Sequence, residues 1–491
     1  MKNLLFIFAI TCISACSVAA QNGIDTTKLK LEQLTVVSRH NVRAPLQKNV
    51  DSTYNNVESK DMLMEFTVPG SHLTERGCIL ETIMGVYFRG WMASEGLLKQ
   101  TEVKVKDNKG GKDTTLAFEI GGIIPDISDY YFAASPRQRT VASTRAFAVG
   151  LLPGNSVEIH HQKIDSKDPD YLPYFVDYGI GVKKNSFDIK LFKKKAYLEV
   201  ESVIDQNKKE LEKSYNVLMK AVNYSESRNA KKWRPTLSTD SIKGEIDLEF
   251  YKKDGNIKEP EAKDTSHLRA ANQLSDALIL QYLEMDKPAN TGLHIDNNDI
   301  KAWRAIADIK DIYSKILFTA PMVAVNTSHR LLCQVKAGIT NNKFNFICTH
   351  DTSISALLTA LQVNDYSLPD SLTIEGLTPN GCKLCIEKYR QGDDYYGRVR
   401  LLYQSTKQVR NLTMLDYNAK KDEHYEMHPK VKNLYFKGLN CVNCNCDNDK
   451  GCTDCDKCKD SGCFYKWEDL MKRIDETIAA FAKVAKGEKP F

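Results

Sequence analysis

Two short polar clusters, far apart in the chain, contain residue types suited to phosphate chemistry. The first is residues 39–45, Arg-His-Asn-Val-Arg-Ala-Pro, and the second is His350-Asp351. Arg39 and Arg43 offer planar donor forks that match a tetrahedral oxyanion. A histidine between them can attack phosphorus as a neutral imidazole, and the flanking cations lower its pKa so that it stays neutral in acid.

The second cluster supplies the groups that such a reaction still needs. His350 can donate to a phosphate oxygen, and Asp351 can protonate the departing alkoxide and then help to activate water. No metal or other cofactor is expected, because guanidinium groups supply the positive charge. His-Asp also occurs in metal-dependent phosphohydrolases, but those need further His and Asp ligands, and no matching cluster is visible. A lone histidine after a strand is more often structural, so the interpretation depends on the combination.

The elements around the two clusters explain how they could meet. Residues 31–38 are largely apolar, β-branched towards their end, and predict a buried strand that ends at Arg39-His40. Residues 343–349 predict a second such strand, which ends at His350-Asp351. Ligands gather at the carboxyl ends of strands in open α/β sheets. We therefore expect one site.

Helical patterns alternate with these strands and indicate an α/β sheet. Residues 73–91 predict a helix with Ile79, Ile83, Val86 and Tyr87 on its packed face. Further amphipathic helices are expected over residues 274–283, after Asp351, and over residues 467–484.

The composition changes between residues 155 and 265. This segment is rich in Lys, Asp and Tyr and has little strand signal. A stripe of Leu211, Tyr215, Leu218, Met219 and Val222 needs a packing partner, which argues against a flexible linker. We predict a mostly α-helical cap over residues 155–265, inserted into a core formed by residues 21–154 and 266–491.

The amino terminus predicts export. Residues 1–20 have a short basic start, an apolar stretch too short to span a bilayer, and small residues before Gln21, as in a cleaved signal peptide. The protein is therefore expected to be periplasmic or secreted. Residues 13–16 also resemble a bacterial lipobox, which would leave Cys16 as a lipid anchor.

Size and charge restrict the class of partner. The chain has 491 residues, is 42% hydrophobic and carries a formal net charge of +5, which is ordinary for an enzyme and too weak to indicate nucleic-acid binding. No later stretch is long and apolar enough for a membrane helix. We expect a small-molecule phosphomonoester as substrate, and a monomer or homodimer.

The motifs resemble the histidine acid phosphatases, the branch of the histidine phosphatase superfamily with Arg-His-Gly-x-Arg-x-Pro and His-Asp signatures. Asn41 replaces the usual glycine, as in periplasmic glucose-1-phosphatases more than in typical phytases. The resemblance extends over most of the mature chain, through residues 73–77, 138–140, 274–277, 349–354 and 403–405.

The resemblance implies a role for each matching residue. His40 becomes the phosphohistidine and Asp351 the proton donor. The phosphoryl oxygens are held by Arg39, Arg43, Arg139 and His350. Arg137 is a second candidate for the role of Arg139, but the segment Gln138-Arg139-Thr140 is the one that matches the family motif. The implied fold is a three-layer α/β core, with a mixed, mostly parallel sheet flanked by helices, and an α-helical cap above the site.

The cysteines favour disulfides. Cys12 and Cys16 fall within the signal peptide, and an even number of the 14 cysteines remains in an exported chain. Seven lie in the segment 441–463, at spacings that could also bind zinc. The resemblance implies that Cys441 and Cys463 are a bridge around an expanded loop.

Three functions compete. The first is an acid phosphatase for sugar phosphates such as glucose 1-phosphate, and the second is a phytase on the same scaffold. The third is an exported binding protein without catalysis, against which the complete set of candidate catalytic residues argues.

Overall fold

A computed structural model describes residues 24–46, 53–98, 103–105, 114–116, 127–163, 188–248, 260–285, 292–421, 425–444, 458 and 461–491. The predicted signal peptide, with Cys16, lies outside these residues. No helix in the described part of the chain combines the length and apolar character that crossing a bilayer requires.

The core is a seven-stranded sheet in the order β10-β9-β8-β1-β7-β4, with β11 beside β9. The strands are β1 (Lys30–Arg39), β4 (Tyr130–Ala134), β7 (Phe344–Thr349), β8 (Lys383–Gln391), β9 (Asp394–Tyr403), β10 (Lys430–Asn433) and β11 (Tyr465–Lys466). Strands β1, β7 and β4 pair in parallel, and the remaining pairings are antiparallel. Because β9 again runs in the direction of β1, four of the seven strands point the same way, which confirms the predicted mixed, mostly parallel sheet.

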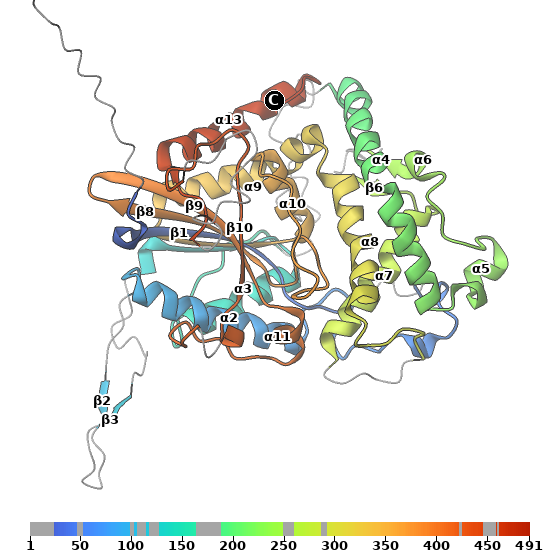
Figure 1. Cartoon of the computed structure of the whole chain (residues 1–491), viewed down its shortest axis with the longest axis horizontal. Coiled ribbons are helices and arrows are strands. Elements are labelled where there is room, and N and C mark those ends of the chain that lie inside the picture. The colour runs from blue at the N-terminus through green and yellow to red at the C-terminus, as the bar shows by residue number, and fades with distance from the viewer. Residues whose placement is uncertain are drawn as a thin grey trace, which may run out of the picture.

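Helices cover both faces of the sheet (Figure 1). Helices α2 (Glu75–Ser94) and α3 (Gln138–Leu151) lie on one face, and α9 (Pro321–Asn341), α10 (Asp351–Ala360) and α13 (Trp467–Ala485) lie on the other. Successive side chains of a strand point to opposite faces. In β1, Val36 accordingly packs in the cluster with Phe88 and Phe147, whereas Val37 packs in the cluster with Leu332 and Leu357. The predicted three layers are confirmed.

A group of helices lies beside this core in Figure 1. Its members are α4 (Ile189–Ala221), α5 (Arg228–Lys232), α6 (Ile242–Glu245), α7 (His267–Glu284) and α8 (Ile300–Phe318). The predicted stripe of α4, including Leu211, Tyr215 and Leu218, is buried in a cluster shared with α7 and α8. The helical group thus includes elements on both sides of residue 265, and the predicted cap boundaries remain a prediction.

Shorter elements complete the chain. They are β2 (Val103–Val105) with β3 (Thr114–Leu116), β5 (Ile246–Asp247) with β6 (Glu261–Ala262), α11 (Thr406–Arg410), and the 3-10 turns η1 (Thr26–Lys28), η2 (Lys60–Met62), η3 (Ile127–Asp129), η5 (Tyr224–Glu226) and η6 (Tyr425–Met427).

The predicted elements differ from the observed ones in two informative places. Helix α7 begins at His267, earlier than the apolar pattern indicates, because the Ser266 side chain accepts a hydrogen bond from the Arg269 amide and caps it. The packed face predicted for α2 was wrong at Ile79, which is 45% exposed, whereas Leu80 is fully buried. The face towards the core is therefore rotated from the predicted one.

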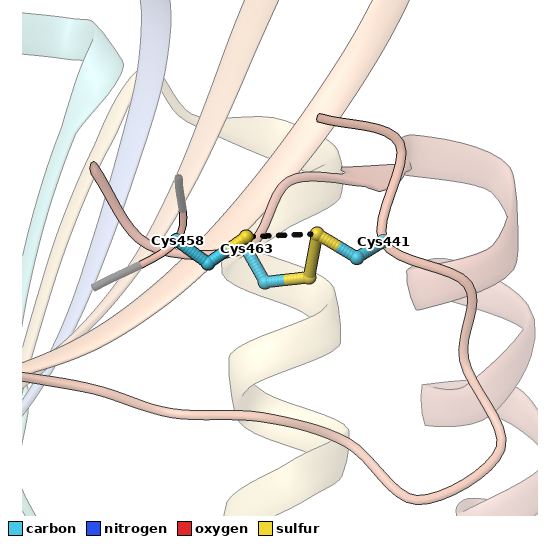
Figure 2. A group of neighbouring side chains, drawn as sticks. All are labelled: Cys441, Cys458 and Cys463. Carbon is cyan, nitrogen blue, oxygen red and sulfur yellow. Dashed lines mark hydrogen bonds between the residues drawn. A yellow bond between two sulfur atoms is a disulfide. The ribbon is translucent and has the colours of Figure 1, made fainter. Parts of the chain in front are cut away.

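The cysteine segment contains the expected disulfide, between Cys441 and Cys463. Figure 2 shows the Cys458 sulfur beside it, 3.5 Å from that of Cys441. Cys446, Cys452 and Cys455 lie outside the described residues.

Helices α2 and α3 cross at a pair of glycines. A Cβ atom added to Gly85 would lie 2.2 Å from the Phe147 carbonyl oxygen, and one added to Gly150 would lie 2.1 Å from that of Thr82. This close approach packs α2 tightly against α3, whose first turn carries Arg139.

We expect Gly85→Ala to lower the free energy of unfolding by about 1–3 kcal/mol, because the new methyl group forces the helices apart. Urea unfolding followed by circular dichroism measures this. Gly244→Ala is the matched control, since no atom lies within 4 Å of its added Cβ, and a change within about 1 kcal/mol is expected. Equal effects at the two positions would contradict the crossing as described.

Candidate active site

The two polar clusters meet because β1 and β7 are neighbours in parallel register. Arg39 lies opposite Thr349 in the ladder, and the His40 amide donates to the Thr349 carbonyl at 3.1 Å. Both strands end at this edge of the sheet, so His40, which follows β1, and His350, which follows β7, lie close together. The imidazole centroids of His40 and His350 are 5.3 Å apart.

His40 is held with one nitrogen protonated and the other free to react. Its Nδ1 lies 2.8 Å from the Asn41 carbonyl oxygen, which can only accept, so Nδ1 carries the proton in the neutral ring and Nε2 keeps its lone pair. Burial lowers the pKa of His40 well below its usual value, and Arg139, His350, Arg39 and Arg43 lower it further. The ring is therefore a neutral potential nucleophile in acid.

Carboxylates orient the two arginines of the first cluster. Arg39 Nη1 lies 2.6 Å from Glu375 Oε1, and its Nη2 lies 3.3 Å from Asp351 Oδ2. Arg43 Nη2 donates to both oxygens of Asp276, at 3.2 and 3.0 Å. Both arginine side chains are buried. Their guanidinium groups are thus fixed in place before any ligand arrives.

His350 lies between Arg139 and Ser135. Arg139 Nη2 donates to Nδ1 at 3.3 Å, which leaves the ring proton on Nε2, 3.0 Å from the Ser135 hydroxyl. Burial lowers the pKa of His350 well below its usual value, and Arg139 lowers it further. Arg137 occupies the N-cap position of α3 and also lowers this pKa, and Arg139 contacts the ring.

Asp351 opens helix α10 and lies in a cluster of opposite charges. Lys310 Nζ is 3.1 Å from Asp351 Oδ2 and 3.2 Å from Asp276 Oδ1, so it bridges the two carboxylates. Burial raises the pKa of Asp351, but Lys310 and Arg39 outweigh it and hold that pKa well below its usual value. Without a ligand, the carboxyl group is ionised.

The structure therefore brings together all six predicted site residues, which are Arg39, His40, Arg43, Arg139, His350 and Asp351. The sequence analysis missed Lys310, Asp276 and Glu375. Asp276 could have been identified from the sequence, because it is a carboxylate among the apolar residues of a buried helix, and buried carboxylates are rare unless they are paired. Nothing in the sequence around Lys310 or Glu375 predicts a role at the site. They reach this edge of the sheet only because of how α8 and the loop after α10 pack in the folded protein.

A cavity of about 240 Å³ is lined by none of the six predicted site residues, but its wall includes Ala44, whose carbonyl accepts a hydrogen bond from Arg43 Nη1 at 3.0 Å. Ala44, Pro45 and Ala277 line it next to Arg43 and Asp276, and Tyr54 and Phe66 add aromatic surface. Among the described residues that line it, Glu65 is charged and none is Lys, Arg or His. The cavity offers room for an uncharged organic group beside an anion-binding site.

Comparisons with known proteins identify a family and several similar phosphatases. The sequence model described as "Histidine phosphatase superfamily (branch 2)" matches residues 30–404. The chain is similar to a glucose-1-phosphatase of Salmonella typhimurium, with 29% identity over 84% of this chain and 91% of that protein. It is similar to phytase AppA of Escherichia coli, with 24% identity over 80% of this chain and 85% of that protein. The solved phytase from Citrobacter braakii shares the fold, with a TM-score of 0.67 and 21% identity over 91% of this chain and 98% of that chain.

The depressed pKa values of His350 and Asp351 predict that anion binding takes up protons. A dianion offsets the surrounding cations and raises both pKa values, so the site gains protons from solution. Calorimetric titration with sulfate at pH 5, in buffers of different ionisation enthalpy, measures that uptake. We expect a positive number of protons per sulfate, smaller in His350→Ala, and a release of protons would contradict the charge arrangement.

Proposed function

The chain belongs to branch 2 of the histidine phosphatase superfamily, and on this basis we propose that it hydrolyses phosphomonoesters through a covalent phosphohistidine on His40. One observation carries the proposal. The Asn41 carbonyl holds the neutral His40 ring by Nδ1, so that Nε2 keeps its lone pair among Arg39, Arg43 and Arg139. That is the arrangement needed to attack the phosphorus of a bound phosphate ester.

In the first step, the Nε2 lone pair forms a bond to phosphorus while the bond from phosphorus to the ester oxygen breaks. Arg39, Arg43 and Arg139 hold the other phosphoryl oxygens and balance their charge. The departing alkoxide takes a proton from Asp351. In the second step, water attacks the phosphohistidine, Asp351 accepts the proton of the water, and the bond from phosphorus to Nε2 breaks to release phosphate.

Asp351 needs a proton that it lacks in the unliganded protein. A phosphate dianion competes with Asp351 for Arg39 and adds negative charge nearby, so it raises the depressed pKa of the carboxyl group. His350 gains a proton for the same reason, and can then donate to a phosphate oxygen. Binding of the substrate thus causes its general acid to take up a proton from solution.

We infer that the preferred substrates are sugar phosphates such as glucose 1-phosphate. Among the described residues, the cavity wall is mostly aromatic and apolar with one carboxylate, which suits a neutral sugar ring and disfavours additional phosphate groups. The similar protein from Salmonella typhimurium is named a glucose-1-phosphatase. Phytate hydrolysis is the second candidate, favoured by the similarity to phytase AppA.

We also propose that the chain acts outside the cytoplasm, in the periplasm or secreted, as a monomer or homodimer. The disulfide between Cys441 and Cys463 supports an oxidising compartment. The alternative of a lipid anchor on Cys16 lies outside the described residues. The reaction itself requires no metal, since side chains supply the cationic and acidic groups.

His40→Ala should abolish turnover while the fold survives, because His40 supplies the nucleophile of the proposed reaction. Asp351→Asn should slow alkyl phosphates by about 100-fold or more. It should slow p-nitrophenyl phosphate far less, because nitrophenolate leaves without protonation. Steady-state rates for both ester types measure this. Equal slowing of the two types would exclude Asp351 as the acid.

The cavity argument predicts a higher kcat/KM for glucose 1-phosphate than for phytate. Glu65→Lys should move that ratio towards phytate, because it replaces the carboxylate of the cavity by a cation. Glu210→Lys, on the exposed surface of α4, is the control for added positive charge. A wild-type preference for phytate, unchanged by Glu65→Lys, would overturn the assignment of the cavity.

A further inference from the structure

Asn41, the residue that departs from the family motif, holds the peptide group next to the nucleophile. Its Oδ1 accepts from the Val42 amide at 2.9 Å, and its backbone carbonyl accepts from His40 Nδ1 at 2.8 Å. That carbonyl and that amide are the two ends of one peptide group. The Asn41 side chain therefore fixes the group that sets the tautomer and orientation of His40.

A buried ion pair lies behind Asn41. Asn41 Nδ2 donates to Glu81 Oε1 at 3.0 Å, and Lys383 Nζ donates to the two Glu81 oxygens at 2.9 and 3.0 Å. Lys383 also donates to the Gly381 carbonyl at 2.7 Å, and the Gly381 amide donates to the His40 carbonyl at 3.1 Å. The hydrogen bonds form a closed ring that begins and ends at the nucleophile.

Gly381 provides the space for this ring. Its φ of +72° favours glycine, and an added Cβ would lie 2.1 Å from Asn41 Nδ2. Any larger residue would push the Asn41 amide out of its place. Asparagine at position 41 and glycine at position 381 are thus sterically matched.

Stability alone does not account for the ion pair. Glu81 and Lys383 are both fully buried, and taking two charges out of water costs free energy that an apolar pair of similar volume does not. What the pair supplies and apolar side chains cannot is an acceptor for Asn41 Nδ2. Through the Asn41 side chain and Gly381, the pair is linked to the two peptide groups that follow His40 in the chain.

We propose that Asn41, Glu81 and Lys383 are positioning residues for the phosphorylation step. The network holds the Asn41 carbonyl against His40 Nδ1, and so presents the unprotonated Nε2 to the phosphorus. The inference rests on the proposed function, since it assigns these residues to the step in which His40 attacks. None of the three touches the reacting atoms.

The first test is Asn41→Ala, which removes both side-chain hydrogen bonds and leaves the ion pair intact. We expect the single-turnover rate of p-nitrophenol release, with enzyme in excess, to fall about 10- to 100-fold, because the nucleophile loses its alignment. KM should change less than about threefold, since the arginines are untouched. Asn345→Ala is the control, because Asn345 is an equally buried asparagine that bonds Thr35 within the sheet.

A matched pair of double variants isolates the acceptor. Glu81→Gln with Lys383→Met removes both charges and keeps an oxygen for Asn41 Nδ2, whereas Glu81→Leu with Lys383→Met removes the oxygen as well. We expect the second to be at least about tenfold slower than the first, because only the second leaves Asn41 Nδ2 without an acceptor. Urea unfolding checks that the two are equally folded.

The outcomes separate this inference from the proposed function. If the wild type leaves phosphate on His40 and Asn41→Ala does so at the same rate, the network has no positioning role and the proposed function stands. The same holds if the two double variants react equally fast. If the wild type forms no phosphohistidine, both the proposed function and this inference are wrong.

Discussion

The parallel pairing of β1 with β7 is the constraint on which the rest of the site depends. With Arg39 opposite Thr349, the residues that follow both strands leave the same edge of the sheet side by side. A slip of one residue would turn every side chain of the strand to the other face. The register is secured by the core, because Val36 and Val37 are fully buried on opposite faces. Packing of ordinary apolar residues thus sets the distance between His40 and His350.

Charge determines what the residues at this edge can do. Arg39, Arg43 and Lys310 form ion pairs with Asp276, Asp351 and Glu375. Removing one member of a pair would leave the other as a buried charge without that partner. Burial, together with Arg139, Arg39 and Arg43, lowers the pKa of His40, whereas burial raises the pKa of Asp351, but Lys310 and Arg39 outweigh that effect. The unliganded site therefore has a neutral base and an ionised acid. An arriving phosphate adds negative charge beside the acid and so raises the pKa of Asp351.

The sequence predicted the parts of this arrangement that depend on local pattern. Both strands, their polar ends and the six site residues follow from apolar runs and a motif, and they are found close to one another. The residues that support them could not be predicted in this way. Lys310 comes from α8, Glu81 from α2 and Lys383 from β8, and each meets the site only through tertiary packing. In α2, Ile83 and Tyr87 are buried as the helical period predicted, but Ile79 is exposed, so the predicted face was wrong at its amino-terminal end.

The central claim is that phosphate is transferred to Nε2 of His40 before water attacks. The most direct measurement is to denature the enzyme in alkali within milliseconds of mixing it with p-nitrophenyl phosphate and to map the bound phosphate by mass spectrometry. The account predicts one phosphate on His40, attached at Nε2, and none in His40→Ala. Phosphate on another residue, or turnover without any covalent phosphate, would contradict it.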